Sequence, residues 1–280
     1  MPELPEAETL RCQLQGEIVG LTVRRLQVHL PRMARAHRSI KQLAKLVEGH
    51  RITRVGRRGK ALLLYLNTKR PATLIVRLGM TGLFRVTPAK QPRSKATAAT
   101  LELSDGRHLR FLNQRQFGSL TARPGHDVDH MPEFEKYGPE PLSDAFSLDY
   151  LKEAFAHRSA KLELVLMDQR VVAGIGKIYA DEICFRAGLR PGRSAKNLTG
   201  PMRARLLKAT REVLLEGIEC RGASARDETY VDLYGLPGSF QDRIYTYQRT
   251  GQPCRVCGTP IRRTRLPGGR GMHWCPECQK

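Results

Sequence analysis

The chain has 280 residues, enough for about two domains that each bury a hydrophobic core. It carries 48 Lys and Arg against 27 Asp and Glu, a formal net charge of +21. This excess indicates an anionic partner, and nucleic acid is the leading candidate because neutralised phosphates release counterions. A ribosomal or other RNA-binding protein fits the same charge.

Membrane and secreted classes are excluded by pattern. We find no apolar run of about 18 residues, so no membrane span is expected. The N-terminus has acids where a secretory signal has basic residues before an apolar stretch. We therefore expect a cytoplasmic, nucleoid-associated protein of bacterial type. Of the seven Cys, four cluster near the C-terminus, and we expect the other three, Cys12, Cys184 and Cys220, to be buried.

The first six residues, 1–6, read Met-Pro-Glu-Leu-Pro-Glu. Removal of Met1 would leave Pro2 with a free secondary amine, and an α-amino group titrates near ~8. Amines of this kind form covalent intermediates with sugar or carbonyl carbons, and the carboxylates of Glu3 and Glu6 can transfer protons beside it. Ordinary capping of a helix start explains the same residues.

Apolar residues at helical spacing predict a helix over residues 3 to about 17, with Gly20 as its stop. From 21 to 122 the pattern changes to short strands broken by Gly, Pro, Asn and Asp, which favours a sandwich or barrel. The seven predicted strands are 22–30, 52–56, 61–66, 73–78, 83–86, 100–103 and 108–112. Residues 20–60 hold twelve Lys and Arg and one acid, Glu48, a one-sided surface that favours phosphate contact.

A Pro- and Gly-rich stretch, 123–145, reads as a linker. Helices are predicted over about 147–157 and 161–169, from Lys177, and after Thr199. The Gly-x-Gly turn 174–176 leads into the helix at Lys177. Free N–H groups at such a helix start can bind an anion, to which Lys177 adds charge.

Two Cys-x2-Cys pairs form the most specific motif. Cys254 and Cys257 precede Cys275 and Cys278 at the spacing of a four-thiolate zinc site, tetrahedral and structural. Disulfides between these cysteines are the less favoured alternative, because the expected compartment is reducing. The arginines and glycines between the pairs predict a β-hairpin with a basic tip.

Together these segments resemble the formamidopyrimidine-DNA glycosylase / endonuclease VIII family over nearly the whole chain. The resemblance rests on residues 1–6, 57–60, 78–82, 115–118, 167–169 and 174–182 and on the zinc motif. Leu4 before Pro5 is similar to the formamidopyrimidine branch, whereas the endonuclease VIII branch usually has Gly there.

The resemblance implies a reaction. Members flip a damaged base out of the duplex. Pro2 would attack C1′ of the deoxyribose, Glu3 would protonate the ring oxygen, and the iminium ion would permit elimination that cuts the strand on both sides. Glu6 would support the site, and Lys60 would grip phosphate near the lesion.

The resemblance also implies DNA contacts. Met80, Arg115 and Phe117 would fill the gap left by the flipped base, with Arg115 bonded to the orphaned base. Arg270 of the zinc finger would clamp phosphates. Residues about 221–233 would cover the base, and the positions assigned to its pocket are Glu182, Gly222, Ala223 and Ser224.

Three positions depart from the family's usual residues. Lys177 stands where Asn is usual, Gln116 replaces a cation, and Arg77 replaces a histidine. Lys177 and Arg77 can still contact DNA. Lys177 would bind phosphate through its point charge, whereas the usual Asn would bind through the fixed geometry of its amide. We therefore expect these departures to bear on lesion range and opposite-base preference more than on the reaction itself.

The sequence therefore predicts an α+β protein: an N-terminal helix with an antiparallel β-sandwich, then a helix–two-turn–helix domain with a zinc-finger hairpin. The predicted domains are residues 1–125, 126–243 and 244–280, with DNA between the first two. The expected function is a bifunctional glycosylase and abasic-site lyase for oxidised purines, acting as a monomer on duplex DNA, with one structural Zn²⁺. The alternatives are an endonuclease VIII-like preference for oxidised pyrimidines and a non-catalytic zinc protein that binds damaged DNA.

Overall fold

The computed structural model describes residues 2–67, 70–224, 230–265 and 271–280. The chain divides into two compact units. The first unit holds residues up to Glu135 together with Cys220–Ser239, and the second holds Lys136–Glu219 with Phe240–Lys280. The chain therefore returns to its first unit after completing most of the second. The predicted three-part division stays a prediction.

Helix α1, Leu4–Ile18, opens the first unit and packs on strand β2. Its side chains at Leu4, Ala7, Leu10 and Leu14 are fully buried, as the spacing predicted. Gly20 follows the helix at φ +90°, a backbone conformation that favours glycine. Burial of this apolar face fixes the helix, and with it the N-terminal residues.

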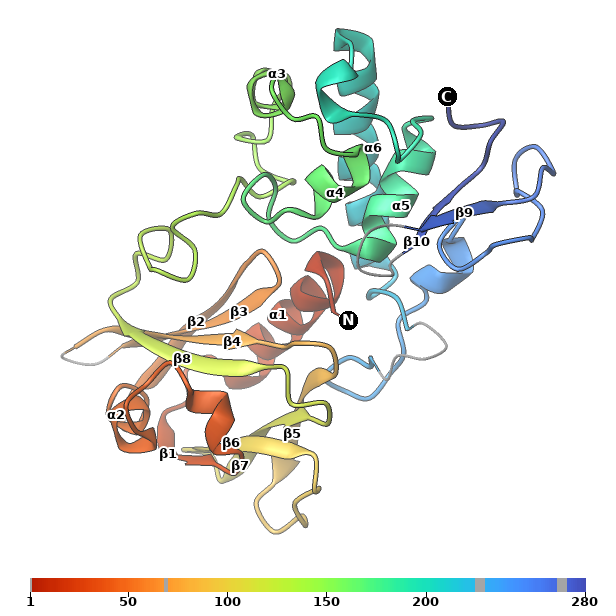
Figure 1. The fold of residues 1–280 in the computed structure, drawn as a ribbon. Coiled ribbons are helices and arrows are strands. Elements are labelled where there is room, and N and C mark those ends of the chain that lie inside the picture. The colour runs from red at the N-terminus through yellow and green to blue at the C-terminus, as the bar shows by residue number, and fades with distance from the viewer. Residues whose placement is uncertain (1, 68–69, 225–229, 266–270) are drawn as a thin grey trace. The chain divides into compact units, whose positions relative to one another are not determined.

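The first unit also contains two four-stranded antiparallel sheets (Figure 1). One has the order β1-β6-β7-β5 and the other β2-β3-β4-β8. Short helices η1, Pro31–Ala34, and α2, Ile40–Lys45, follow β1. The strand bounds are β1 Val23–Val28, β2 Arg51–Arg58, β3 Ala61–Asn67, β4 Ala72–Arg77, β5 Gly82–Pro88, β6 Thr97–Leu103, β7 Arg107–Asn113 and β8 Ser119–Pro124.

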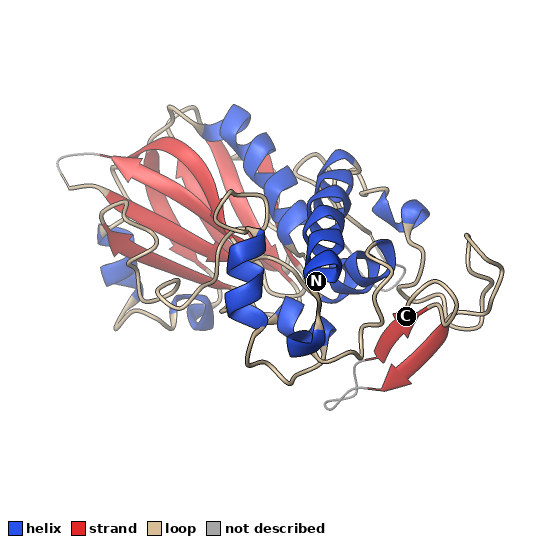
Figure 2. Ribbon diagram, turned by 90° about the horizontal axis from the view of Figure 1, so that it is seen from above, coloured by secondary structure: helices blue, strands red, loops and turns tan. Residues whose placement is uncertain are grey.

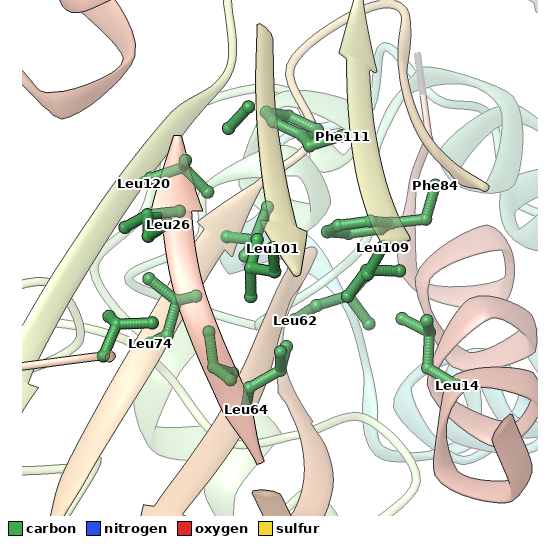
Figure 3. Packing of buried hydrophobic residues seen from close by; sticks show 14 of the residues in the cluster. Leu14, Leu26, Leu62, Leu64, Leu74, Phe84, Leu101, Leu109, Phe111 and Leu120 are labelled. Atoms are coloured by element: carbon green, nitrogen blue, oxygen red, sulfur yellow. The ribbon is translucent and has the colours of Figure 1, made fainter. Parts of the chain in front are cut away.

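Leucines and phenylalanines from both sheets and from α1 form one hydrophobic core (Figure 3). Leu62 and Leu64 on β3 and Leu109 and Phe111 on β7 are all fully buried. Phe84 and Phe111 lie with ring centroids 5.3 Å apart. Strands β3 and β7 are buried along most of their length, and the two sheets form the sandwich that the sequence predicted.

Two expectations for this unit were wrong. The sequence predicted seven strands, but an eighth, β8, pairs with β4 from Ala72↔Pro124 to Arg77↔Ser119. The predicted linker, 123–145, overlaps only the last two residues of this strand, and residues 119–122 were not predicted as a strand. Cys12 is exposed on α1, not buried, whereas Cys184 and Cys220 are buried.

The second unit is mainly helical, with one described β-hairpin (Figure 2). Helices α4 and α5 are joined by the glycine-containing turn and match the predicted helix–two-turn–helix. No helix of the described residues has the combined length and hydropathy that a bilayer crossing requires. The elements are α3 Leu148–Phe155, α4 Leu162–Met167, α5 Lys177–Arg186, η2 Ala195–Asn197, α6 Gly200–Glu219, η3 Phe240–Arg243, β9 Arg262–Arg265 and β10 Gly271–Trp274.

Candidate active site and DNA-binding residues

The start of α1 places two buried carboxylates directly after Pro2. Pro2 is buried, and Glu3 and Glu6 are 2% and 1% exposed. Glu3 donates its backbone N–H to Oε2 of Glu6 at 2.7 Å, which is one half of a capping box. The helix start thus serves the capping function and at the same time buries two acids that lie close to Pro2 in the sequence.

A segment from far along the chain closes over Glu6 within the first unit. Oε1 of Glu6 accepts the backbone N–H of Ala223 at 2.7 Å. Gly222 has φ +85°, and a Cβ there would lie 2.6 Å from Cγ of Glu6. Ser224 donates from Oγ to the carbonyl of Tyr230 at 2.6 Å. The structure therefore brings together Glu6 and the three predicted pocket residues 222–224.

No pattern in the sequence indicated the hydrogen bonds that hold the residues after this segment, Asp232 and Leu233, against the rest of the first unit. Gln13 donates to Oδ2 of Asp232 at 2.9 Å and accepts the N–H of Leu233 at 2.9 Å. Arg85 donates to the Asp232 carbonyl at 2.6 Å. Asp232 is fully buried. Because Gln13 and Asp232 are 219 residues apart, no local pattern signals their contact.

Met80, Arg115 and Phe117 lie on two loops that contact each other closely. Residues 78–81 join β4 to β5, and residues 114–118 join β7 to β8. A Cβ on Gly79 would meet the Phe117 carbonyl carbon at 2.6 Å, and Arg115 donates its N–H to Oγ1 of Thr81 at 2.9 Å.

These loops present an unusual surface. Phe117 is 53% exposed, Arg115 is exposed and Met80 is half-buried. The Arg115 guanidinium carbon lies 5.7 Å from the Phe117 ring centre, a distance typical of a cation–π contact. A large exposed phenylalanine on a loop that packs closely against its neighbour suits insertion into a base stack.

Lys60 and Arg77 lie elsewhere on the same unit. Lys60 follows Gly59 in the turn between β2 and β3 and is half-buried. Arg77, at the end of β4, donates to the Glu133 carbonyl at 3.0 Å and lies 5.6 Å from the Phe134 ring centre. Arg77 is thus partly engaged within the protein.

In the second unit Lys177 begins α5 and is surrounded by acids. Its Nζ pairs with Oε1 of Glu163 at 2.8 Å and with Oδ2 of Asp181. Both acids are fully buried, while the Lys177 side chain is 17% exposed. The cation predicted to bind phosphate is therefore compensated internally, and sequence reasoning gave no sign of either partner.

Glu182, the next residue on α5 after Asp181, fixes the connection to the C-terminal region. Its carboxylate accepts backbone N–H groups from Tyr245, Thr246 and Tyr247 at 2.8 to 2.9 Å. The Thr246 hydroxyl donates to it at 3.0 Å. Its predicted place in a base pocket stays a prediction.

The four predicted zinc ligands lie together in the second unit. The sulfur atoms of Cys254, Cys257, Cys275 and Cys278 all lie within 4.8 Å of one another. The Cys254–Cys278 and Cys257–Cys275 pairs are 3.8 and 3.4 Å apart. Sulfurs about 2.3 Å from a tetrahedral zinc lie at comparable separations, so the set fits one structural Zn²⁺ that holds the hairpin β9–β10. Arg270 lies outside the described residues.

The fold and these residues define a zinc-finger protein with a proline just before its first helix, two buried acids at the start of that helix and a helix–two-turn–helix. Three family patterns cover it in order: the formamidopyrimidine-DNA glycosylase N-terminal domain at residues 1–120, its H2TH domain at 137–229, and the zinc finger found in FPG and IleRS at 251–280. The chain belongs to the formamidopyrimidine-DNA glycosylase family and is an enzyme of that class.

Individual relatives agree over the full length. The Thermus thermophilus formamidopyrimidine-DNA glycosylase is 43% identical over 279 residues, covering 100% of this chain and 98% of the relative. A crystal structure of the Thermus thermophilus protein has a TM-score of 0.88 at 41% identity, covering 99% and 98% of the two chains.

Two Lactococcus lactis structures cover 100% of both chains. One is a mutant in complex with DNA containing Fapy-dG, with a TM-score of 0.90 at 31% identity. The other is the wild-type protein in complex with DNA containing an oxidised pyrimidine, with a TM-score of 0.88 at 31% identity.

Proposed function

We propose that this glycosylase excises oxidised purines, such as 8-oxoguanine and formamidopyrimidines, from duplex DNA and cuts the strand at the resulting abasic site. The observation that carries the proposal is the pair of buried acids after Pro2: Glu3 follows it directly, and Glu6 lies three residues further on. The Fapy-dG complex of the Lactococcus lactis relative supports the purine substrate.

The reaction begins at the Pro2 amine, once Met1 has been removed. The nitrogen attacks C1′ and the bond from C1′ to the base breaks; the Pro2 nitrogen gives up its proton, and the departing base takes up one proton. Glu3 gives a proton to the ring oxygen, and the sugar opens to an iminium ion on Pro2. Glu6 supports the site, because its two oxygens hold the Glu3 N–H and the segment 222–224.

Strand cleavage follows from the iminium ion. Its positive charge acidifies the C2′ proton, whose loss expels the 3′ phosphate, and a second elimination expels the 5′ phosphate. Hydrolysis then releases the sugar fragment and regenerates the Pro2 amine.

DNA contacts come from both units. Met80, Arg115 and Phe117 would fill the space of the extruded nucleotide, and Lys60, Arg77, Lys177 and Arg270 would contact phosphates. Zn²⁺ would hold the hairpin in shape through its four cysteines. We expect the protein to act as a monomer in the cytoplasm, where bacterial DNA lies.

Borohydride trapping tests the proposal. The intact chain is first weighed by mass spectrometry to establish that Met1 is absent. Wild type incubated with an 8-oxoguanine duplex and borohydride should form a covalent complex by reduction of the iminium ion. Pro2→Gly should lose that complex while still binding DNA. Absence of trapping by the wild type would leave a non-catalytic DNA-binding protein.

A second candidate substrate is an oxidised pyrimidine, as in the endonuclease VIII branch. The oxidised-pyrimidine complex of the Lactococcus lactis relative favours it. Single-turnover excision from matched 8-oxoguanine and thymine-glycol duplexes separates the two. Faster release of the pyrimidine would reverse the substrate assignment without affecting the Pro2 chemistry.

A further inference from the structure

A buried ion cluster surrounds Lys177 in the second unit. Glu163 on α4 and Asp181 on α5 both contact its ammonium group, and both carboxylates are fully buried. On the hairpin side, Nδ1 of His273 lies 2.7 Å from Oδ2 of Asp181. Two carboxylates and one ammonium give this cluster a net charge of −1 when both acids are ionised.

The two carboxylates of this cluster are buried but accept few hydrogen bonds. Apart from the ion pair with Lys177, neither Glu163 oxygen nor Oδ1 of Asp181 has a hydrogen-bond donor among the described residues. By contrast, neighbouring Glu182 is held by three backbone N–H groups and a hydroxyl. Because buried charge without hydrogen bonds is costly, Glu163 and Asp181 are suited to take up a proton.

The position of the cluster links it to the proposed DNA contact. Lys177 is the first residue of α5, directly after the turn 174–176. The Lys177 side chain is partly exposed, at 17%, so its flexible stem can move the ammonium group outward. The same charge can therefore pair either with the two buried acids or with a phosphate at the helix start.

We propose that Glu163 and Asp181 are positioning residues that hold the Lys177 ammonium inside the protein until one of the two carboxylates is protonated. Protonation removes one negative charge, and Lys177 then becomes available to a DNA phosphate. Affinity for DNA should accordingly rise as the pH falls. This inference rests on the proposed function, because it assumes that the α5 start contacts DNA.

The electrostatic surroundings support a transition near neutral pH. Burial and mutual repulsion raise the pKa of Glu163 to about 7, and burial raises the pKa of Asp181 to about 7. The groups that face this pair are Lys177, Glu182 and Cys184 on α5, and His273 and Arg263 on the hairpin. His273 contributes no charge change in this range, since burial lowers its pKa to about 4.

The test measures affinity for a duplex with a tetrahydrofuran abasic analogue at pH 6 to 8.5 and constant ionic strength. Wild type should bind more weakly as pH rises. Glu163→Gln should bind at pH 8 with about the affinity that wild type shows at pH 6. At pH 8, the slope of the logarithm of its affinity against the logarithm of salt concentration should steepen by the amount expected for about one additional phosphate contact. Neither the pH profile nor the salt slope would change if Glu163 served packing alone.

Two comparisons make the test specific. Glu216→Gln also removes one negative charge, from a partly exposed acid paired with Arg186 and Arg243, and should keep the wild-type pH profile. The double variant Glu163→Gln/Lys177→Gln should lose the increase in DNA affinity at pH 8 that Glu163→Gln shows. If Glu163→Gln fails to fold, as judged by its melting transition, Asp181→Asn replaces it.

A wild-type pH profile in Glu163→Gln, or a gain that persists without Lys177, would overturn the inference. Borohydride trapping on the same preparations separates this outcome from failure of the proposed function. Trapping with a flat affinity profile contradicts the positioning role alone. Loss of trapping in wild type contradicts the Pro2 chemistry and leaves the affinity measurement valid.

Discussion

Glu6 accepts the backbone N–H of Ala223 at 2.7 Å although 217 residues separate them. The same carboxylate accepts the N–H of Glu3 at 2.7 Å. One buried acid thus connects the start of α1, where the proposed chemistry takes place, to the segment 222–224 expected beside the extruded base. A substitution that pushes this segment away from Glu6 should therefore affect both the start of α1 and the segment 222–224.

Gly222→Ala should therefore destabilise the first unit and slow excision. The new Cβ would lie 2.6 Å from Glu6 Cγ at φ +85°, and overpacking of this kind costs about 1–3 kcal/mol. Thermal melting and single-turnover excision would measure the two effects. Gly49→Ala is the matched control, because Gly49 has φ +76° but nothing within 4 Å of the added Cβ. Equal effects from the two variants would assign the loss to backbone strain and not to Glu6.

Phe117→Ala should weaken DNA binding with little loss of stability. Phe117 is 53% exposed, and loss of a stacking aromatic ring costs about 1–3 kcal/mol of binding. Phe111→Ala is the contrasting variant, because a fully buried phenylalanine costs about 3–5 kcal/mol of folding stability when truncated. Affinity for the abasic-analogue duplex and urea unfolding distinguish them. Unchanged affinity in Phe117→Ala would remove Phe117 from the DNA contact.

Zinc removal should disorder the hairpin and leave the first unit folded. Trp274 is the chain's one tryptophan, adjoins Cys275 and lies 4.3 Å from the Arg190 guanidinium carbon. A strong chelator should therefore shift its fluorescence and lower DNA affinity. The circular dichroism of the β-sandwich should persist, since its core contains no zinc ligand. Full cooperative unfolding on chelation would show that the two units depend on each other.

The sequence predicted the elements well where periodicity is local. Helix α1 follows from helical spacing, seven of the sandwich strands follow from short segments broken by turn residues, and the cysteine spacing defined the zinc site. β8 was missed because its end at Pro124 runs into the Pro- and Gly-rich stretch that predicted a linker, while its pairing with β4 is non-local. Only the family resemblance predicted that Met80, Arg115 and Phe117 fill the gap left by the flipped base. Without it, Met80 and Phe117 would have been predicted to be core residues.

Other features depend on tertiary contacts that no local pattern carries. Gln13 and Asp232 contact each other from opposite ends of the sequence. Lys177 reads as a surface or phosphate-binding lysine, and only the fold reveals that two buried acids surround it. The charge of a residue is visible in sequence, but its partner is decided by packing.

Those acids also predict how folding stability depends on pH. The folded-state pKa of Glu163, about 7, lies above its ordinary value of 4.5, so the folded protein binds this proton more tightly than the unfolded chain. The stabilising contribution is full below about pH 4.5 and declines as pH rises toward 7, beyond which it is absent. Glu163→Gln keeps the neutral form at every pH. Its melting temperature relative to wild type should therefore be higher at pH 8 than at pH 5, and the control Glu216→Gln should show no such difference. An equal offset at both pH values would mean that Glu163 keeps its ordinary pKa in the folded protein.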